Sequence, residues 1–145
     1  MRHLTHLGDA WATIGAAAVV AAIGEPALGA AMLAANVLSH IPVQLLKRLV
    51  ARPRPSDAFG RPLALVPLPD PFSFPSGHAA ATTAVATTLA LAHPHPHALA
   101  APIALSLAAL VSYSRVALRV HHPSDVLAGI GLGLGGALAA GALLS

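Results

Sequence analysis

The stretch PSDVLAGIGLGLGGALAAGALL, residues 123–144, decides the fold class of this chain. It carries one charged residue, Asp125, and is long enough to cross a bilayer, which takes about 20 apolar residues. Two pairs of glycines are spaced four apart, at positions 129 and 133 and at positions 131 and 135. Such spacing lets neighbouring helix backbones approach closely. The stretch therefore predicts a membrane-spanning helix that packs within a bundle.

The composition of the whole chain agrees with a membrane protein. Of its 145 residues, 56% are hydrophobic and 9% are charged, whereas a soluble domain has about 25% charged residues. So few charges cannot cover a surface in water. The length fits a single domain, residues 1–145, and we expect no removable signal peptide at its start.

Five apolar segments can be drawn, at residues 9–23, 26–50, 77 to just before HPHPH, 98–118 and 123–144. The second, fourth and fifth are long enough to span a bilayer, while the first and third are shorter. Asp9 is expected to cap the first helix. Strands are not expected, because the alternating pattern of a membrane barrel is absent. We therefore predict an all-α, polytopic transmembrane bundle of about five helices.

Charge and residue usage exclude several partners. The net charge is +3, but aromatic residues make up only 3% of the chain, so stacking platforms for nucleic acid are missing. The cations cluster beside particular motifs, which favours an anionic headgroup or phosphate as the partner. The absence of cysteine excludes disulfides and cysteine-ligated metals.

Three polar clusters lie at helix ends that alternating up-and-down helices bring to one membrane face. The first is KRLVARPRP, residues 47–55, which could also be a basic anchor at the membrane edge. The second is PSGH, residues 75–78. If Ser76 caps a helix, free backbone N–H groups and the helix dipole form an anion site, Gly77 permits close approach, and His78 can donate a proton. The alternative is a capped helix with a polar histidine.

The third cluster is SRVALRVHHPSD, residues 114–125. Asp125 falls in the first turn of the last helix, from where its carboxylate can reach and orient His121. The alternatives are a charge at a helix N-terminus for Asp125 and a snorkelling edge cation for Arg115. Together, the cations and two histidines around a helix N-terminus suit phosphoryl transfer.

These motifs resemble those of the type 2 phosphatidic acid phosphatase family, whose active site is shared with vanadium haloperoxidases. The family pattern is K-x6-R-P, then P-S-G-H, then S-R-x5-H-x3-D, and this chain matches all three in order. The spacing selects Arg54 over Arg52 and His121 over His122. A soluble haloperoxidase is excluded, because this chain is too short and too apolar.

The resemblance implies a role for each matched residue. His121 is the nucleophile that becomes phosphorylated, Asp125 orients it, and His78 protonates the leaving group. The residues that hold the phosphate are Lys47, Arg54, Ser76, Gly77 and Arg115. No metal or other cofactor is implied. Because His121 must be neutral and His78 protonated, we expect a bell-shaped pH profile.

The function predicted is a membrane-embedded lipid phosphate phosphatase that works through a phosphohistidine. Its substrate is phosphatidic acid, phosphatidylglycerol phosphate or a polyprenyl (undecaprenyl) diphosphate. A polyprenyl-phosphosugar phosphatase and a non-catalytic membrane scaffold are the alternatives. The bilayer is the only other partner expected, no nucleic acid is expected, and the sequence leaves the oligomeric state open.

The resemblance also bears on location and completeness. It implies a multi-pass protein of the bacterial inner membrane, with the site on the outer face, although the positive-inside rule favours the cytoplasmic face. Many family members have six spanning helices, so we expect one N-terminal helix fewer here. The remaining histidines are interpreted as plain polar residues; they are His3, His6, His40, His93, His95 and His97.

Overall fold

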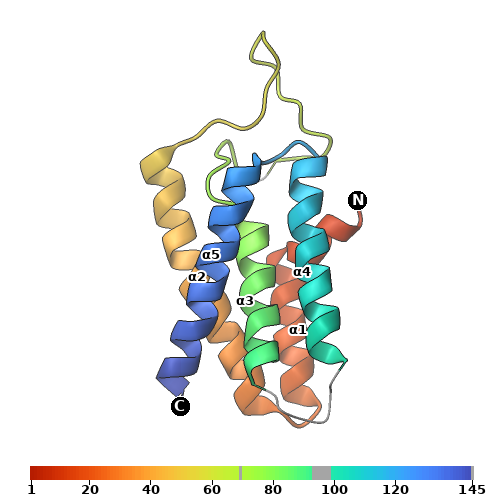
Figure 1. Ribbon diagram of the computed structural model, residues 1–145, viewed down its shortest axis with the longest axis vertical. Coiled ribbons are helices and arrows are strands. Elements are labelled where there is room, and N and C mark those ends of the chain that lie inside the picture. The colour runs from red at the N-terminus through yellow and green to blue at the C-terminus, as the bar shows by residue number, and fades with distance from the viewer. Residues whose placement is uncertain (69, 93–98, 145) are drawn as a thin grey trace.

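The computed structural model describes residues 1–68, 70–92 and 99–144 as a bundle of five α-helices after a short 3-10 helix. The elements are η1 (Leu4–Gly8), α1 (Ala10–Ala22), α2 (Pro26–Val50), α3 (Gly77–Leu91), α4 (Ala100–Ala117) and α5 (Pro123–Leu144). The described residues contain no strand beyond two isolated bridges, Pro53 with Phe72 and Ser56 with Pro62. The predicted all-α bundle of about five helices is confirmed (Figure 1).

Helix α3 forms the centre of the bundle, packed against α2, α4 and α5 (Figure 1). Its alanines, such as Ala80 and Ala84, are completely buried, and their small side chains let the neighbouring helices close in. Its threonines donate to carbonyls one turn earlier, Thr82 to His78 and Thr88 to Ala84, both at 2.9 Å. These bonds let polar side chains lie inside an apolar bundle.

Helix α5 packs on α3 and α2 through glycines. A Cβ atom would lie 2.4 Å from the Ser76 carbonyl oxygen if added at Gly129, and 2.5 Å from the Ala80 carbonyl oxygen if added at Gly133. At Gly136 it would lie 2.6 Å from the Ala35 carbonyl oxygen. The close approach expected at positions 129 and 133 therefore occurs.

The same expectation is wrong for positions 131 and 135, where an added Cβ would meet nothing within 4 Å. The helical period of 3.6 residues explains the difference, because a step of two residues turns the side chain to the opposite face. A spacing of four identifies residues on a common face, but not which face meets the bundle.

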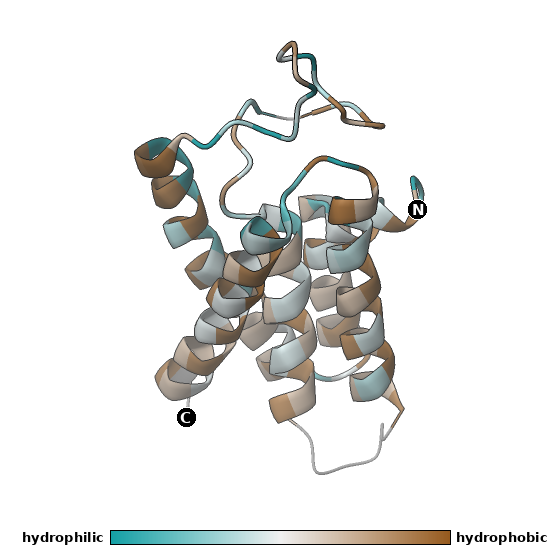
Figure 2. Ribbon diagram, turned by 45° about the horizontal axis from the view of Figure 1, so that its top comes forward, coloured by the Kyte–Doolittle hydropathy of each residue, from teal (hydrophilic) through white to brown (hydrophobic). Residues whose placement is uncertain are grey.

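Within the part of the chain that the structure describes, three helices are long and apolar enough to cross a membrane, at Pro26–Val50, Ala100–Ala117 and Pro123–Leu143. This matches the expectation that the second, fourth and fifth segments span while the first and third are shorter. Brown, hydrophobic residues cover the helices, and teal residues concentrate in the loops at one end (Figure 2). The prediction of an integral membrane protein is confirmed. The HPHPH sequence, residues 93–97, lies outside the described residues.

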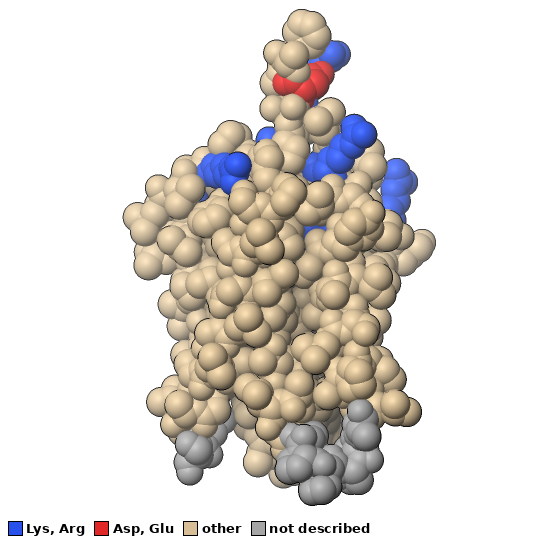
Figure 3. Space-filling model, viewed as in Figure 1, with Lys and Arg blue, Asp and Glu red and all other residues tan. Residues whose placement is uncertain are grey.

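The chain's Lys and Arg side chains gather at the end of the bundle that carries the 51–76 loop, and the visible lower body is bare of them (Figure 3). Asp9, at the start of α1, lies at the same end. It occupies the N-cap position, but its side chain makes no capping hydrogen bond. The expectation that it caps this helix is wrong, because its carboxylate oxygens bind His6 and His78 instead.

Candidate functional site

A pocket of about 200 Å³ lies where α2 and α4 end and α3 begins. It brings together residues from all three sequence motifs: Lys47, Arg54, Gly77, His78, Arg115 and His121. Two other predicted site residues, Ser76 and Asp125, are completely buried and do not line it. The pocket also contains residues that sequence reasoning did not select: Gly8, Asp9, Ala10, His40, Gln44 and Asp70.

The start of α3 forms one wall of the pocket. The Ser76 hydroxyl accepts a hydrogen bond from the Ala79 backbone N–H at 3.4 Å, as an N-cap does. The Ser76 backbone N–H donates to the Asp125 carbonyl at 2.9 Å, which ties the start of α3 to the start of α5. Ser76 therefore stabilises the N-terminus of α3 without lining the pocket, whereas Gly77 lies at the pocket surface.

His121 is held by a backbone carbonyl. Its Nδ1 lies 2.6 Å from the Ser73 carbonyl oxygen, and since a carbonyl only accepts, Nδ1 must donate. The lone pair of neutral His121 is therefore on Nε2, which lies 3.5 Å from the Arg54 guanidinium. Burial lowers the pKa of His121 below its ordinary value, and the charges of Arg54 and Arg115 add to this lowering. These conditions favour a neutral imidazole.

Asp125 lies farther from His121 than expected. The shortest distance from its carboxylate to Nδ1 is 3.7 Å, longer than a hydrogen bond. One carboxylate oxygen accepts from Arg52 at 2.9 Å, and the other accepts from the His122 backbone N–H at 2.8 Å. Asp125 thus fixes the turn that carries His121 and supplies a nearby negative charge, while the Ser73 carbonyl sets the tautomer.

Lys47 and Arg54 converge on one carboxylate. Asp70 accepts from Lys47 Nζ at 2.5 Å and from Arg54 at 3.1 Å. Burial raises the pKa of Asp70, but the hydrogen bond and charge of Lys47 and the charge of Arg54 outweigh it, so the net pKa is lowered. A carboxylate already lies against the cations predicted to bind phosphate. Asp70 was missed in the sequence because it belongs to none of the motifs.

Arg115 is buried and extends toward the N-terminal turn. One of its guanidinium nitrogens donates to the Thr5 hydroxyl. Its Nε is buried and makes no hydrogen bond to any described residue, nor does Nδ1 of His40. Unpaired buried donors are costly and favour binding of an acceptor such as a phosphate oxygen.

A metal centre was not expected from the sequence. Among residues 1–68, 70–92 and 99–144, no group of three or more His, Asp or Glu side chains is arranged to hold a metal ion. The metal-free reaction stays a prediction, which a chelator tests directly.

Residues 27–144 match the model of the PAP2 superfamily, which covers most of the chain. The chain belongs to the PAP2 superfamily. It is 37% identical over 139 residues to decaprenylphosphoryl-5-phosphoribose phosphatase of Mycobacterium tuberculosis, covering 91% of this chain and 72% of that protein. The resemblance stated from the three motifs is confirmed.

Two solved structures share the fold. The structure of Aquifex aeolicus LpxE superposes with a TM-score of 0.80 at 26% identity, covering 96% of this chain and 81% of that one. The transmembrane PAP2 type phosphatidylglycerolphosphate phosphatase of Bacillus subtilis gives a TM-score of 0.79 at 28% identity, covering 98% and 73%. With the family match, these relatives confirm the prediction of a membrane-embedded lipid phosphatase.

Proposed function

We propose that residues 1–145 act as one domain that hydrolyses the phosphomonoester of a lipid headgroup through a phosphohistidine on His121. One observation carries the proposal: the Nε2 lone pair of His121 lies in a buried pocket lined by Arg54 and Arg115, with His78 in the same pocket. A neutral nucleophile, a proton donor and fixed cations are the groups that phosphoryl transfer needs.

In the first step, Nε2 of His121 attacks phosphorus and forms an N–P bond. The P–O bond to the lipid breaks, and His78 protonates the departing oxygen, so the dephosphorylated lipid leaves as an alcohol. The Ser73 carbonyl accepts from Nδ1–H and stabilises the ring as it becomes positively charged.

In the second step, water attacks the phosphohistidine. His78, neutral after giving up its proton, takes a proton from the water as the new P–O bond forms and the N–P bond breaks. Inorganic phosphate leaves, and both histidines return to their starting forms. The residues proposed to hold the phosphate oxygens are Lys47, Arg54, Gly77 and Arg115, with Ser76 supporting the helix terminus and Asp125 the His121 turn.

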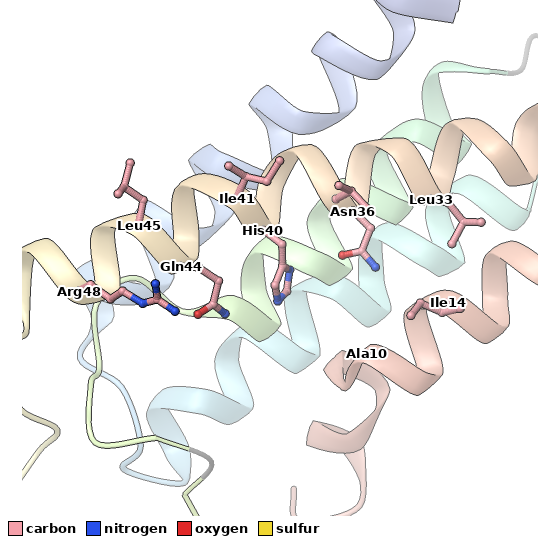
Figure 4. Close-up of a pocket in the computed structure, with 10 residues that line it drawn as sticks. Ala10, Ile14, Leu33, Asn36, His40, Ile41, Gln44, Leu45 and Arg48 are labelled. Carbon is pink, nitrogen blue, oxygen red and sulfur yellow. The ribbon is translucent and has the colours of Figure 1, made fainter.

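An apolar groove of about 630 Å³ between α1 and α2 supports a lipid substrate (Figure 4). Its apolar lining consists of Ala10, Ile14, Leu33, Val37, Ile41 and Leu45. It shares Ala10, His40 and Gln44 with the catalytic pocket, so the two adjoin. A lipid can therefore lay its hydrocarbon chain in the groove while its terminal phosphate reaches His121.

A polar stripe in this groove narrows the substrate class. Asn36, His40, Gln44 and Arg48 are spaced four apart and lie on one side of α2 (Figure 4). Arg48 lines the groove but not the catalytic pocket, so its cation is available to a second anionic group. We therefore propose a lipid with a terminal phosphomonoester and a separate phosphodiester, the chemistry in the name of the mycobacterial relative.

The test is a phosphate-release assay of the purified chain with and without a chelator. The panel is phosphatidic acid, phosphatidylglycerol phosphate, a polyprenyl diphosphate and a polyprenyl-phosphoryl phosphosugar. We expect the phosphosugar lipid to have the highest kcat/KM and the chelator to have no effect. Loss of activity on chelation overturns the metal-free mechanism, and no release from any lipid overturns the phosphatase function.

Arg48→Gln tests the substrate class within the same assay. We expect KM for the polyprenyl-phosphoryl phosphosugar to rise about three- to tenfold, since the lost contact is one partly exposed ion pair. KM for phosphatidic acid should not change. Arg119→Gln is the matched control, because Arg119 is also exposed at this end of the bundle but lies outside the groove. Equal effects on both lipids contradict the assignment.

The location proposed is the bacterial inner membrane, with the site on the outer face. All eight Lys and Arg belong to segments at the end that carries the site. Several of them line the pocket, which weakens the positive-inside rule as a guide. The chain has no cysteine, so Phe59→Cys, at a position 82% exposed in the loop, gives a single label. A membrane-impermeant maleimide should label it in spheroplasts, and labelling only after lysis contradicts the outer face.

A further inference from the structure

The N-terminal turn, residues 4–9, lies directly on the catalytic histidine of α3. His78 Nε2 is 2.8 Å from Asp9 Oδ1. A Cβ atom added at Gly8 would be 2.8 Å from Cδ2 of the same ring, so the backbone of the turn touches its edge. Asp9 and Gly8 precede residues 27–144, the part of the chain that matches the family model.

We propose that Asp9 is a positioning residue for His78, fixing its tautomer and stabilising its protonated form during proton transfer to the leaving group. This inference rests on the proposed phosphatase function. It adds to the three motifs a fourth element, which comes from the turn before α1.

The hydrogen-bond chemistry assigns a job to each ring nitrogen. Burial raises the pKa of Asp9, but its hydrogen bonds and ion pairs with His6 and His78 lower it overall, so Asp9 is ionised. An ionised carboxylate only accepts, and Nε2 of His78 therefore donates. This leaves Nδ1 as the nitrogen that gives a proton to the leaving oxygen and takes one from water. The arrangement is that of a carboxylate behind a catalytic imidazole.

Asp9 is held in place from its other side. Its second carboxylate oxygen lies 2.9 Å from Nδ1 of His6, an exposed residue. The same turn carries Thr5, whose hydroxyl accepts from Arg115. One short turn thus fixes both a proton donor and a phosphate-binding cation, which explains why these polar residues precede an apolar helix.

Asp9 acts against the other charges around His78. Burial lowers the pKa of His78 to about 4, and the charges of Arg115 from α4 and His121 from the following turn add to this lowering, whereas Asp9 raises it. The pocket also contains His40 and Lys47 from α2, and Arg54 and Asp70 from the loop. Asp70 is already paired with Lys47 and Arg54. Asp9 is therefore the carboxylate in hydrogen-bond contact with His78, and its removal should make proton donation harder.

The test compares two leaving groups on the purified 145-residue chain. Phosphatidic acid releases a poor alkoxide leaving group and needs an acid, whereas p-nitrophenyl phosphate releases a stable phenolate and does not. We expect Asp9→Asn to lower kcat about 10- to 100-fold on phosphatidic acid, part of the 10²–10⁴ range of general acid catalysis. It should lower kcat less than about threefold on p-nitrophenyl phosphate. Asp9→Glu, which keeps the carboxylate, should recover part of the loss.

Asp57→Asn is the matched control, since Asp57 is a carboxylate in the loop at the same end and pairs with Arg61 away from the pocket. It should match the wild type on both substrates. Equal losses for Asp9→Asn on both substrates indicate a structural role and overturn the inference. Full activity of Asp9→Asn on phosphatidic acid overturns it as well.

A second measurement keeps the inference separate from the proposed function. If the wild type hydrolyses neither substrate, the proposed phosphatase function is wrong. The effect of Asp9 on the protonation of His78 is then tested by NMR of the ¹⁵N-labelled histidines. The titration midpoint of His78, assigned with His78→Asn, should fall by about one pH unit or more in Asp9→Asn. An unchanged midpoint overturns the inference.

Discussion

The two histidines of the pocket are held in opposite ways. His121 donates from Nδ1 to the uncharged carbonyl of Ser73, which leaves its lone pair on Nε2, 3.5 Å from the Arg54 guanidinium. His78 donates from Nε2 to the charged carboxylate of Asp9, which leaves Nδ1 free. Both partners fix the tautomer of the imidazole, but an uncharged carbonyl favours the imidazolium less than a charged carboxylate does.

This difference favours His121 as the neutral nucleophile and His78 as the proton donor, against a background in which burial lowers the pKa of both rings. His121 is nearly completely buried, and the arginines beside it disfavour a second positive charge. His78 has the carboxylate that His121 lacks at hydrogen-bond distance, since Asp125 lies 3.7 Å from the His121 ring. The residue types are the same, and the partners decide the roles proposed for them.

The largest effect should come from His121→Asn, which removes the proposed nucleophile. We expect a loss of about 10⁴-fold or more in kcat on both phosphatidic acid and p-nitrophenyl phosphate, because no covalent intermediate can form. Acid-quenched phosphoenzyme should disappear. His122→Asn, the neighbouring imidazole outside the pocket, should lose less than about tenfold. Comparable losses for the two variants contradict the assignment of the nucleophile.

The next effect should come from His78→Asn and depends on the leaving group. We expect about 10²- to 10⁴-fold loss of kcat on phosphatidic acid, and a smaller loss on p-nitrophenyl phosphate. Phosphoenzyme should still form from the aryl ester in a rapid acid quench. A uniform loss on both esters would show that the two histidines do not divide nucleophile and acid between them.

The pH profile of the wild type tests the roles of the two histidines without a mutation. His121 must be unprotonated to attack, and its pKa is lowered by burial. Activity should therefore persist as pH falls below about 6.5, the ordinary histidine value, and decline only as His121 gains its proton. His78 must be protonated, and burial lowers its pKa to about 4, so activity should decline as the pH rises from the acidic range toward neutral. A kcat/KM profile with an acidic limb above the ordinary value, or no limb at all, contradicts this account.

The smallest effect should come from Asp70→Asn, on the side of the pocket where Lys47 and Arg54 lie. Removing the negative charge leaves both cations available to an anion, so inorganic phosphate and vanadate should inhibit about three- to tenfold more tightly. The Asn side chain keeps an acceptor for the loop. The leaving-group dependence should not change, because Asp70 does not contact His78. Weaker inhibition would show that Asp70 organises the two cations instead of competing with phosphate.

Much of the fold follows from the sequence because a bilayer allows few solutions. Long apolar segments interrupted by proline and charge must be helices, and their alternation brings the motif-bearing ends together. The two residues that the spacing rule selects, Arg54 and His121, line the pocket, whereas their neighbours Arg52 and His122 bind Asp125 and do not line it. Of the two glycine pairs predicted to pack in α5, only Gly129 and Gly133 do so, because a spacing of four does not say which side of the helix faces the bundle.

Ser73, Asp70 and Asp9 were not identified from the sequence, each for a physical reason. Ser73 acts through its backbone carbonyl, which every residue has. Asp70 lies in a proline-rich loop, and a loop has no sequence periodicity from which the position of its side chains could be predicted. Asp9 matched a helix cap so well that its side chain was assigned to its own helix.

Composition, segment length and motif spacing are enough to predict a helical membrane protein with the motifs of the PAP2 superfamily, because they are local properties of the chain. Which nitrogen of each histidine donates a hydrogen bond, and to which group, follows only from the tertiary structure. Those contacts join residues 48 positions apart, His121 with Ser73, and 69 positions apart, His78 with Asp9. The proton chemistry of the pocket depends on atoms that meet only after the helices pack.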